Sequence, residues 1–181
     1  MQRPDFTPIA SRWPTEQRLV RILWEQLAWA QQAKKHNSDL THGMTFVTPL
    51  FTRQPTIVTT YDLSFIHFPD NFPTLQRHYL TAMSRRSCRR ARHVITISES
   101  GRQDVHHFFN VPLERISVVY PGVDAAYKPL PAADVAAFRQ AKQLPERFLL
   151  HVGTLQPRKN IPTLLDAFAR VDDQSLHLVL V

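Results

Sequence analysis

Segments typical of β-strands alternate with segments typical of α-helices along most of the chain, and this alternation limits the fold more than any other feature. The strand segments are short and rich in apolar and β-branched residues, whereas the helical segments carry apolar residues at helical spacing. The expected strands are 39–42, 56–60, 93–97, 116–120, 147–152 and 176–181. The expected helices are 16–35, 72–90, one that follows Ser98 or Ser100, one near 134–140, and 160–171. This alternation predicts an α/β fold of parallel sheets with helices on both faces.

A proline-bearing stretch interrupts the alternation, and we expect a domain boundary there. Residues 125–133 contain the run Lys128-Pro129-Leu130-Pro131, which is typical of a linker. Residues 1–124 would then form one domain and residues 134–181 the start of a second. The sequence ends within the last expected strand, and two consecutive strands do not make a stable sheet. We therefore expect both domains to be incomplete and the chain to be a fragment.

The composition is that of a globular protein able to bury a core, with 43% hydrophobic and 20% charged residues. No apolar run approaches the roughly 20 residues that a transmembrane helix needs. We also expect no signal peptide, because the first residues lack an apolar core. Cys88 is the only cysteine, which excludes an intrachain disulfide and a thiolate metal site. These features together predict a cytoplasmic location.

Positive charge is concentrated in one segment of the chain. The formal net charge is +7, and no acidic residue falls between Asp70 and Glu99. Five arginines near the end of the expected helix 72–90 lie in that interval: Arg85, Arg86, Arg89, Arg90 and Arg92. They form either a solvated helix end or a surface that binds anionic lipid or a phosphorylated substrate. Nucleic acid is not expected, because aromatic residues are not interleaved with these arginines.

The turn over 153–160 joins an expected strand to an expected helix and carries two cations, Arg158 and Lys159. Asn160 is a good N-cap residue, and Pro162 suits the first helical turn, where its missing N–H costs little. The positive end of the helix dipole repels cations, so a bound anion such as phosphate would resolve the conflict. The alternative, from spacing alone, is a pair of solvated cations beside an ordinary turn.

Polar residues that follow two other strands are further candidates for functional contacts. Tyr61 either contacts a ligand or packs at the end of its strand, and Asp62 is expected to cap the following turn. Ser98 or Ser100 is expected to cap the next helix, and Ser100 with Gln103 fits a capping box.

Several of these signals occur in a fixed order along the chain. They are His42-Gly43, the runs 59–65 and 95–100, the run Pro121-Gly122-Val123-Asp124, and the turn 153–160. This order and spacing resembles glycosyltransferase family 4, the retaining nucleotide-sugar transferases of the GT-B fold. The resemblance covers nearly the whole chain and is most specific at 153–160. It extends to the bacterial mannosyltransferase-like members that build polysaccharides.

The resemblance implies two Rossmann-like domains that face a cleft, with the donor bound mainly by the second. Arg158 and Lys159 would contact the donor diphosphate, and Gly153 would let the backbone approach it. Fixed cations would stabilise the charge that grows on the leaving nucleoside diphosphate. The family implies neither a metal nor another cofactor for this step. Three residues would line the cleft: His42, Ser98 and Gly122, the last by allowing a tight turn.

Tyr61 and Asp62 occupy the place where family members commonly carry His-Asp, so we expect the catalytic contacts there. A phenol can donate a hydrogen bond but is a poor base at neutral pH. Two further parts of the family pattern are absent from this sequence: the first strand with its glycine-bearing loop, and the paired glutamates that grip the donor. We therefore expect this fragment alone to be inactive.

The leading hypothesis is a hexosyltransferase that moves a sugar, with mannose as the candidate, from a nucleoside diphosphate to a glycan or lipid-linked acceptor with retention. One alternative is a nucleotide-sugar epimerase of the same architecture. Another is a non-catalytic basic module that docks on a membrane or a phosphorylated glycan. Peripheral contact with the cytosolic face of an anionic membrane would involve Arg85, Arg86, Arg89 and Arg90.

Overall fold

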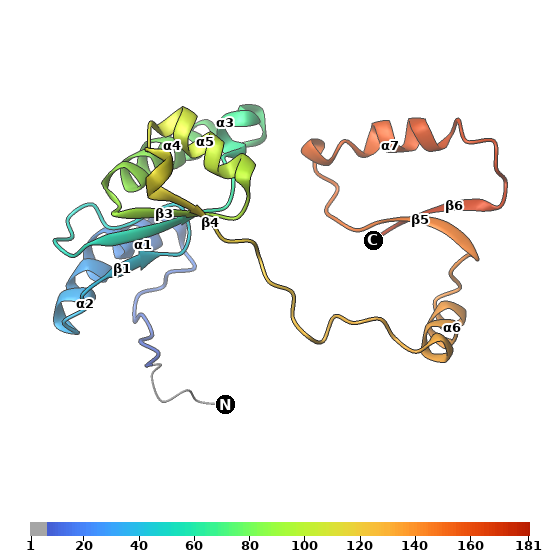
Figure 1. Cartoon of the computed structure of the whole chain (residues 1–181), viewed down its shortest axis with the longest axis horizontal. Helices are drawn as coiled ribbons and strands as arrows, with labels where there is room; N and C mark the ends of the chain where they lie inside the picture. The colour runs from blue at the N-terminus through green and yellow to red at the C-terminus, as the bar shows by residue number, and fades with distance from the viewer. Residues whose placement is uncertain (1–6) are drawn as a thin grey trace. The chain divides into compact units, whose positions relative to one another are not determined.

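The computed structural model describes residues 7–181, and the chain divides into two compact units. Unit 1 spans Met1–Pro121 and contains a four-stranded sheet, while unit 2 spans Gly122–Val181 and contains a two-stranded sheet (Figure 1). All strand pairs in both sheets are parallel. The predicted α/β fold with parallel sheets is confirmed.

The four strands of unit 1 pair in chain order. They are β1 (Thr41–Gly43), β2 (Thr56–Thr60), β3 (His93–Thr96) and β4 (Ile116–Val118). The register places Thr41 beside Thr56, Val58 beside Val94, and Thr96 beside Val118. Because every pair is parallel, the carboxyl ends of the four strands lie along one edge of the sheet and the amino ends along the other.

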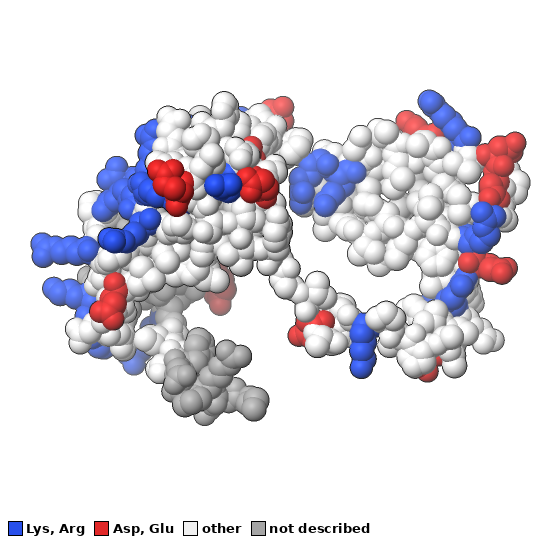
Figure 2. All heavy atoms as spheres, viewed as in Figure 1, with Lys and Arg blue, Asp and Glu red and all other residues white. Residues whose placement is uncertain are grey.

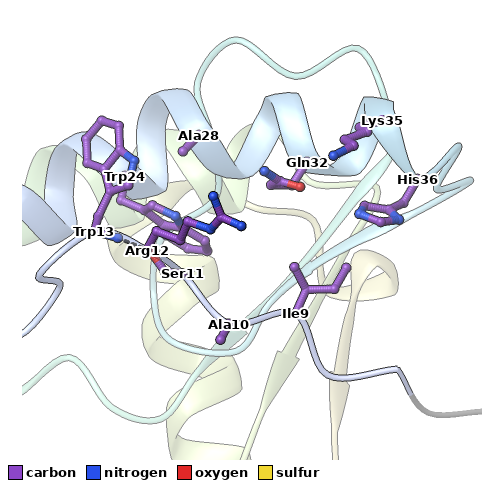
Figure 3. Close-up of a pocket in the computed structure, with 10 residues that line it drawn as sticks. All are labelled: Ile9, Ala10, Ser11, Arg12, Trp13, Trp24, Ala28, Gln32, Lys35 and His36. Atoms are coloured by element: carbon purple, nitrogen blue, oxygen red, sulfur yellow. Dashed lines mark hydrogen bonds between the residues drawn. The ribbon is translucent and has the colours of Figure 1, made fainter.

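The helix predicted over 16–35 is present, but a π-helical turn interrupts it. Its parts are α1 (Arg18–Leu23), the π turn Trp24–Ala28, and α2 (Trp29–Lys35). The rings of Trp24 and Trp29 stack with 6.4 Å between their centroids. Residues 9–13 lie along this helical segment and leave a hollow of about 450 Å³, into which Trp24, Gln32 and His36 project (Figure 3).

The connection from β2 to β3 holds a short helix and a 3-10 turn that the sequence did not predict, followed by the predicted long helix. These elements are α3 (Ser64–His67), the turn Pro69–Asn71, and α4 (Thr74–Arg90). α4 begins two residues later than expected because Phe72 is extended, with φ −128° and ψ 136°. A residue that precedes a proline is biased to this conformation, and Pro73 follows Phe72.

The core of unit 1 joins the sheet to α4 and α5 (Glu99–Phe109), which cover one of its faces (Figure 1). Each large apolar side chain that is fully buried contributes about 1.5–3 kcal/mol. The buried residues of this core are Val58, Leu63, Phe65, Cys88, Ala91, Val94, Val105, Phe109, Val111 and Ile116. They come from β2, β3 and β4, from the helices between these strands, and from the connections between these elements, so the core holds the strands and the helices together.

Gly43 ends β1 at a position where the chain folds back closely on itself. A Cβ atom at this position would lie 2.4 Å from the carbonyl oxygen of Val47 and 2.8 Å from Cγ2 of Thr48. The loop after β1 is held against β2 by a hydrogen bond from the N–H of Phe46 to the carbonyl of Thr59. Glycine is therefore required here by the close approach of this loop.

Unit 2 contains two helices and two paired strands. They are α6 (Ala132–Ala141), β5 (Arg147–His151), α7 (Ile161–Phe168) and β6 (Leu176–Leu180). The strands pair over their full length, from Arg147 beside Leu176 to His151 beside Leu180. α7 ends three residues earlier than predicted. Apolar side chains of both strands are exposed in this unit, including Leu149, Leu150 and Leu180.

Among the described residues, α4 is the longest helix at 17 residues. No helix within residues 7–181 is both long enough and apolar enough to cross a membrane.

Candidate functional site

Three of the residues predicted at a functional edge lie close to the carboxyl ends of the unit 1 strands. His42 is in β1, Tyr61 follows β2, and Ser98 lies two residues after β3. Loops at the carboxyl edge of a parallel sheet are where ligands bind in open α/β folds. The topology therefore brings these side chains to the edge at which the sequence placed them.

His42 is held by the neighbouring strand. Its Nε2 atom lies 2.9 Å from Oγ1 of Thr59, within hydrogen-bonding distance, and the imidazole is partly buried. Thr59 itself is buried, at 7% exposure. This contact fixes the ring orientation and leaves part of the ring accessible at the edge.

Tyr61 is the first residue after β2 and has 37% of its surface exposed. Its ring packs edge-on against Phe46, with 6.0 Å between centroids. Its backbone is close to the start of α5, because a Cβ atom on Gly101 would lie 3.7 Å from the carbonyl oxygen of Tyr61. One side of the ring is therefore packed against Phe46 while more than a third of the residue faces solvent.

Asp62 caps the turn that leads into α3. Its Oδ1 atom accepts a hydrogen bond from the backbone N–H of Ser64 at 2.9 Å. The predicted turn-capping role is confirmed, and this role uses one of the two carboxylate oxygens. The residue is exposed.

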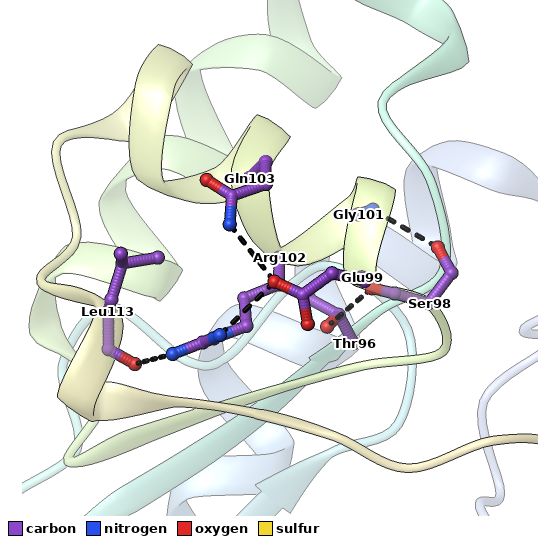
Figure 4. Close-up of polar contacts among 7 residues, drawn as sticks. All are labelled: Thr96, Ser98, Glu99, Gly101, Arg102, Gln103 and Leu113. Atoms are coloured by element: carbon purple, nitrogen blue, oxygen red, sulfur yellow. Dashed lines mark hydrogen bonds and ion pairs between the residues drawn. The ribbon is translucent and has the colours of Figure 1, made fainter.

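Ser98 is the N-cap of α5 (Figure 4). It has the extended backbone of an N-cap residue, with φ −156° and ψ 159°, and its Oγ accepts a hydrogen bond from the N–H of Gly101 at 3.0 Å. Ser100 lies inside the first helical turn, so the capping box predicted for Ser100 and Gln103 is wrong. Instead, Gln103 Nε2 donates to Glu99 Oε1 at 2.9 Å.

The Glu99 carboxylate lies at the positive end of α5. It accepts hydrogen bonds from Gln103 and from Arg102, the latter at 3.1 Å, and these contacts lower its pKa, with Gln103 the larger cause. Arg102 also donates to the carbonyl of Leu113 at 3.3 Å, which ties the helix start to the turn before β4 (Figure 4). This network stabilises the segment that presents Ser98.

Gly122 does not form the tight turn that the sequence predicted. Its backbone has no left-handed conformation, no turn is assigned at 121–124, and a Cβ atom would meet nothing within 4 Å. The chain leaves β4 without a turn, and a larger residue would fit at this position.

The turn between β5 and α7 carries the two cations that the sequence singled out. Arg158 and Lys159 lie in a 3-10 turn, Pro157–Lys159, and both are exposed. The Arg158 Nε donates to Oε1 of Gln156 at 3.0 Å. Within residues 7–181, neither cation forms an ion pair with a carboxylate.

Gly153 follows β5 with φ 158°, a backbone conformation that residues with a Cβ atom rarely adopt. Its N–H donates to the carbonyl of Val181 at 2.9 Å. The backbone at the start of this turn is therefore anchored to the chain beyond β6, and no side chain projects from it.

Asn160 occupies the N-cap position of α7, as predicted, but does not cap the helix with its side chain. It is left-handed, with φ 50°, and its Oδ1 accepts the hydroxyl of Thr163 at 2.8 Å. The first turn of α7, in which Pro162 lacks an N–H, therefore has no side-chain N-cap bond. Two uncompensated cations thus lie beside a helix start that has no side-chain cap, which is an arrangement suited to an anion.

One contact near the unit 1 edge was not predicted from the sequence. His67 Nε2 lies 2.8 Å from Oδ2 of Asp104 and so joins α3 to α5. Because this contact joins two separate helices, no local spacing in the sequence indicates it.

The arginines near the end of α4 contact two different parts of unit 1. Arg85 lies over the ring of Phe109 at 5.9 Å, and Arg89 Nε donates to the Phe109 carbonyl at 2.8 Å. Arg90 instead donates to the carbonyl of Leu50. α4 ends at Arg90, so Arg92 is outside the helix.

Comparison with known proteins identifies the relatives of this chain. The family model of Glycosyltransferase Family 4 matches residues 3–127. The chain is 28% identical over 142 residues to the O-antigen chain mannosyltransferase B of Escherichia coli, covering 78% of this chain and 36% of that protein. It is 28% identical over 177 residues to the O-antigen chain mannosyltransferase RfbU of Salmonella typhimurium, covering 96% of this chain and 46% of that protein.

Solved structures show the same fold at lower identity. Anabaena Alr3699/HepE in complex with UDP-glucose matches with a TM-score of 0.63 and 19% identity, over 84% of this chain and 42% of that one. Its complex with UDP and glucose gives a TM-score of 0.65 over 90% of this chain and 43% of that one. These neighbours are GT-B glycosyltransferases, and this chain corresponds to less than half of each relative named. With two thirds of its length matched by the family model, the chain belongs to glycosyltransferase family 4.

Proposed function

We propose that this chain supplies the donor-diphosphate site and part of the acceptor side of a retaining hexosyltransferase. The observation that carries the proposal is the turn between β5 and α7. There Arg158 and Lys159 are exposed, have no carboxylate partner within residues 7–181, and precede a helix whose first turn lacks a side-chain cap.

The proposed chemistry follows from where charge develops. When the bond between the sugar and the nucleoside diphosphate breaks, negative charge grows on the leaving phosphate oxygens. Arg158 would bind these oxygens through a planar fork and Lys159 as a point charge. Such contacts strengthen as the charge grows, so they lower the barrier more than they tighten ground-state binding. Gly153 would let the backbone approach the same oxygens.

The relatives support the choice of substrates. Two of them are named mannosyltransferases of the O-antigen chain, and a structural neighbour binds UDP-glucose. We therefore take a nucleotide-sugar as the donor, mannose as the candidate sugar, and a glycan or lipid-linked acceptor. The family match favours transfer over the epimerase alternative.

Residues at the unit 1 edge would position the sugar and acceptor. Tyr61 replaces the family's histidine and would donate a hydrogen bond from its hydroxyl to the sugar. Asp62 would keep Tyr61 in place through the turn that it caps. His42 and Ser98 would line the cleft, and Gly122 would contribute backbone only.

The proposed transfer needs neither a metal nor another cofactor, because two fixed cations supply the charge at the diphosphate. The enzyme would work in the cytoplasm, with peripheral contact to the cytosolic face of the membrane through Arg86 and Arg90, the exposed arginines at the end of α4 that do not contact Phe109.

A transfer assay on a longer form of the protein that includes this chain tests the proposal. Release of nucleoside diphosphate that requires an acceptor, and formation of a product with the donor's anomeric configuration, would support retaining transfer. Release without acceptor, or conversion of the free donor into an epimer, would contradict it.

A further inference from the structure

A second basic site lies at the opposite edge of the unit 1 sheet. A polar hollow of about 560 Å³ opens where the strands begin, because its lining includes Thr56 at the start of β2, Arg92 just before β3, and Arg115 just before β4. Figure 2 shows Lys and Arg side chains gathered on the side of unit 1 away from the point where the chain leaves β4. The arginines that line this arginine hollow are Arg53, Arg89, Arg90, Arg92 and Arg115.

The arginine hollow has no counter-charge in the described part of the chain. None of its lining residues is Asp or Glu. Within residues 7–181, the arginines that form ion pairs are Arg21, Arg102 and Arg147, and none of these lines the hollow. Five like charges around one hollow repel each other, and a bound anion would remove that repulsion.

Three of the guanidinium groups are held in place by backbone carbonyls. Arg89 donates to Phe109, Arg90 donates to Leu50, and Arg115 donates to the carbonyls of Arg89, at 3.1 Å, and Ala91. A guanidinium carries five N–H donors, so each of these groups keeps donors for a further acceptor. The charges are thus positioned without being neutralised.

We propose that the arginine hollow binds a phosphate group, carried either by a lipid head group or by a soluble phosphate compound. Guanidinium groups bind phosphate oxygens in a two-point geometry, and several of them around one hollow can engage several oxygens of the same phosphate group. The site lies at the edge opposite Tyr61 and Ser98, so it serves binding and not the transfer chemistry. This inference does not depend on the proposed sugar transfer.

The test compares two double variants of the 181-residue chain, both in an Arg158→Gln, Lys159→Gln background that keeps the proposed donor site out of the titration. Arg53→Gln with Arg92→Gln removes two charges from the hollow that form no side-chain hydrogen bond within residues 7–181. Lys142→Gln with Arg170→Gln removes the same charge from exposed positions outside the hollow. Circular dichroism melting confirms that both variants remain folded.

Inorganic pyrophosphate, titrated by calorimetry, and vesicles of phosphatidylglycerol with phosphatidylcholine, in a sedimentation assay, serve as probes. Of the two probes, the one that the background protein binds should bind the hollow variant at least about tenfold more weakly, as expected when charge-assisted contacts are lost. The control variant should bind that probe as tightly as the background protein does. Pyrophosphate binding alone identifies a soluble ligand, and vesicle binding that requires phosphatidylglycerol identifies a lipid head group. Equal loss in both variants, or binding of neither probe, would overturn the proposal.

Discussion

The Oγ atom of Ser98 accepts a hydrogen bond from the N–H of Gly101 at 3.0 Å, and this contact fixes the start of α5 at the carboxyl edge of the unit 1 sheet. Sequence alone left the cap open between two serines. Because only Ser98 has the extended backbone of an N-cap, the two positions should respond very differently to the same substitution.

Replacing Ser98 with alanine should lower the free energy of unfolding by about 1 kcal/mol, the usual cost of a lost N-cap. Ser100→Ala is the matched control, since Ser100 is an exposed residue of the first helical turn, and it should change stability by only a few tenths. Urea unfolding of the parent chain and of the two variants measures both changes in the free energy of unfolding. Equal losses would contradict the assignment of Ser98 as the cap.

Two glycines should respond in opposite ways to the addition of a methyl group. Gly43→Ala places a Cβ atom 2.4 Å from a backbone oxygen, so we expect a loss of about 1–3 kcal/mol, the scale of core overpacking. In Gly122→Ala the added Cβ atom has no neighbour within 4 Å, so this substitution should leave the free energy of unfolding unchanged. Thermal unfolding followed by circular dichroism distinguishes the two, and a neutral Gly43→Ala would show that the loop after β1 moves away.

Alkaline pH should destabilise the fold through Cys88. Burial raises the pKa of this thiol to about 11 from an ordinary 9.0, opposed by a hydrogen bond with Thr60. Between those values the unfolded chain loses the proton while the folded chain keeps it. The free energy of unfolding therefore falls as pH rises, by up to about 1.4 kcal/mol per pH unit.

Cys88→Ala isolates this contribution from other groups that titrate at alkaline pH. Chemical denaturation at a series of pH values should give a shallower decline for the variant than for the parent chain. Identical slopes would mean that Cys88 ionises freely in the folded state.

Removing divalent metal should not stop the proposed transfer. With Arg158 and Lys159 supplying the charge at the diphosphate, a longer form of the protein should keep its rate after dialysis against EDTA. A loss of activity that added Mg²⁺ or Mn²⁺ restores would show that a metal ion carries part of that charge.

Most strands and helices could be predicted from the sequence because the spacing of their apolar residues is a local pattern. The side-chain contacts at the site could not, because they join residues that are far apart in the sequence. The late start of α4 was also readable in principle, since Pro73 forces Phe72 into an extended conformation. The contact of His42 with Thr59 depends on strand register, and that of His67 with Asp104 on helix packing. The residues that line the arginine hollow come from three separate connections between strands. The sequence therefore indicated only the arginines at and just after the end of one helix, and not the hollow itself.

The choice of Asn160 as a cap failed for a different reason. The residue type and its position were right, but a left-handed backbone and the nearby Thr163 hydroxyl turned its side chain to another partner. The preference of a residue type for the N-cap predicts its position at the start of a helix, but not which hydrogen bond its side chain makes there.

The central claim is that Arg158 and Lys159 hold the donor diphosphate, and the most direct measurement is nucleotide-sugar binding by a longer form of the protein that contains this chain. Calorimetric titration with UDP-glucose and with GDP-mannose, on the parent protein and on Arg158→Ala and Lys159→Ala variants, gives affinities, and the transfer rate of the same proteins gives the catalytic effect. We expect each substitution to weaken binding of the preferred donor and to lower transfer by about 10²-fold or more. Unchanged affinity and rate in both variants would contradict the account.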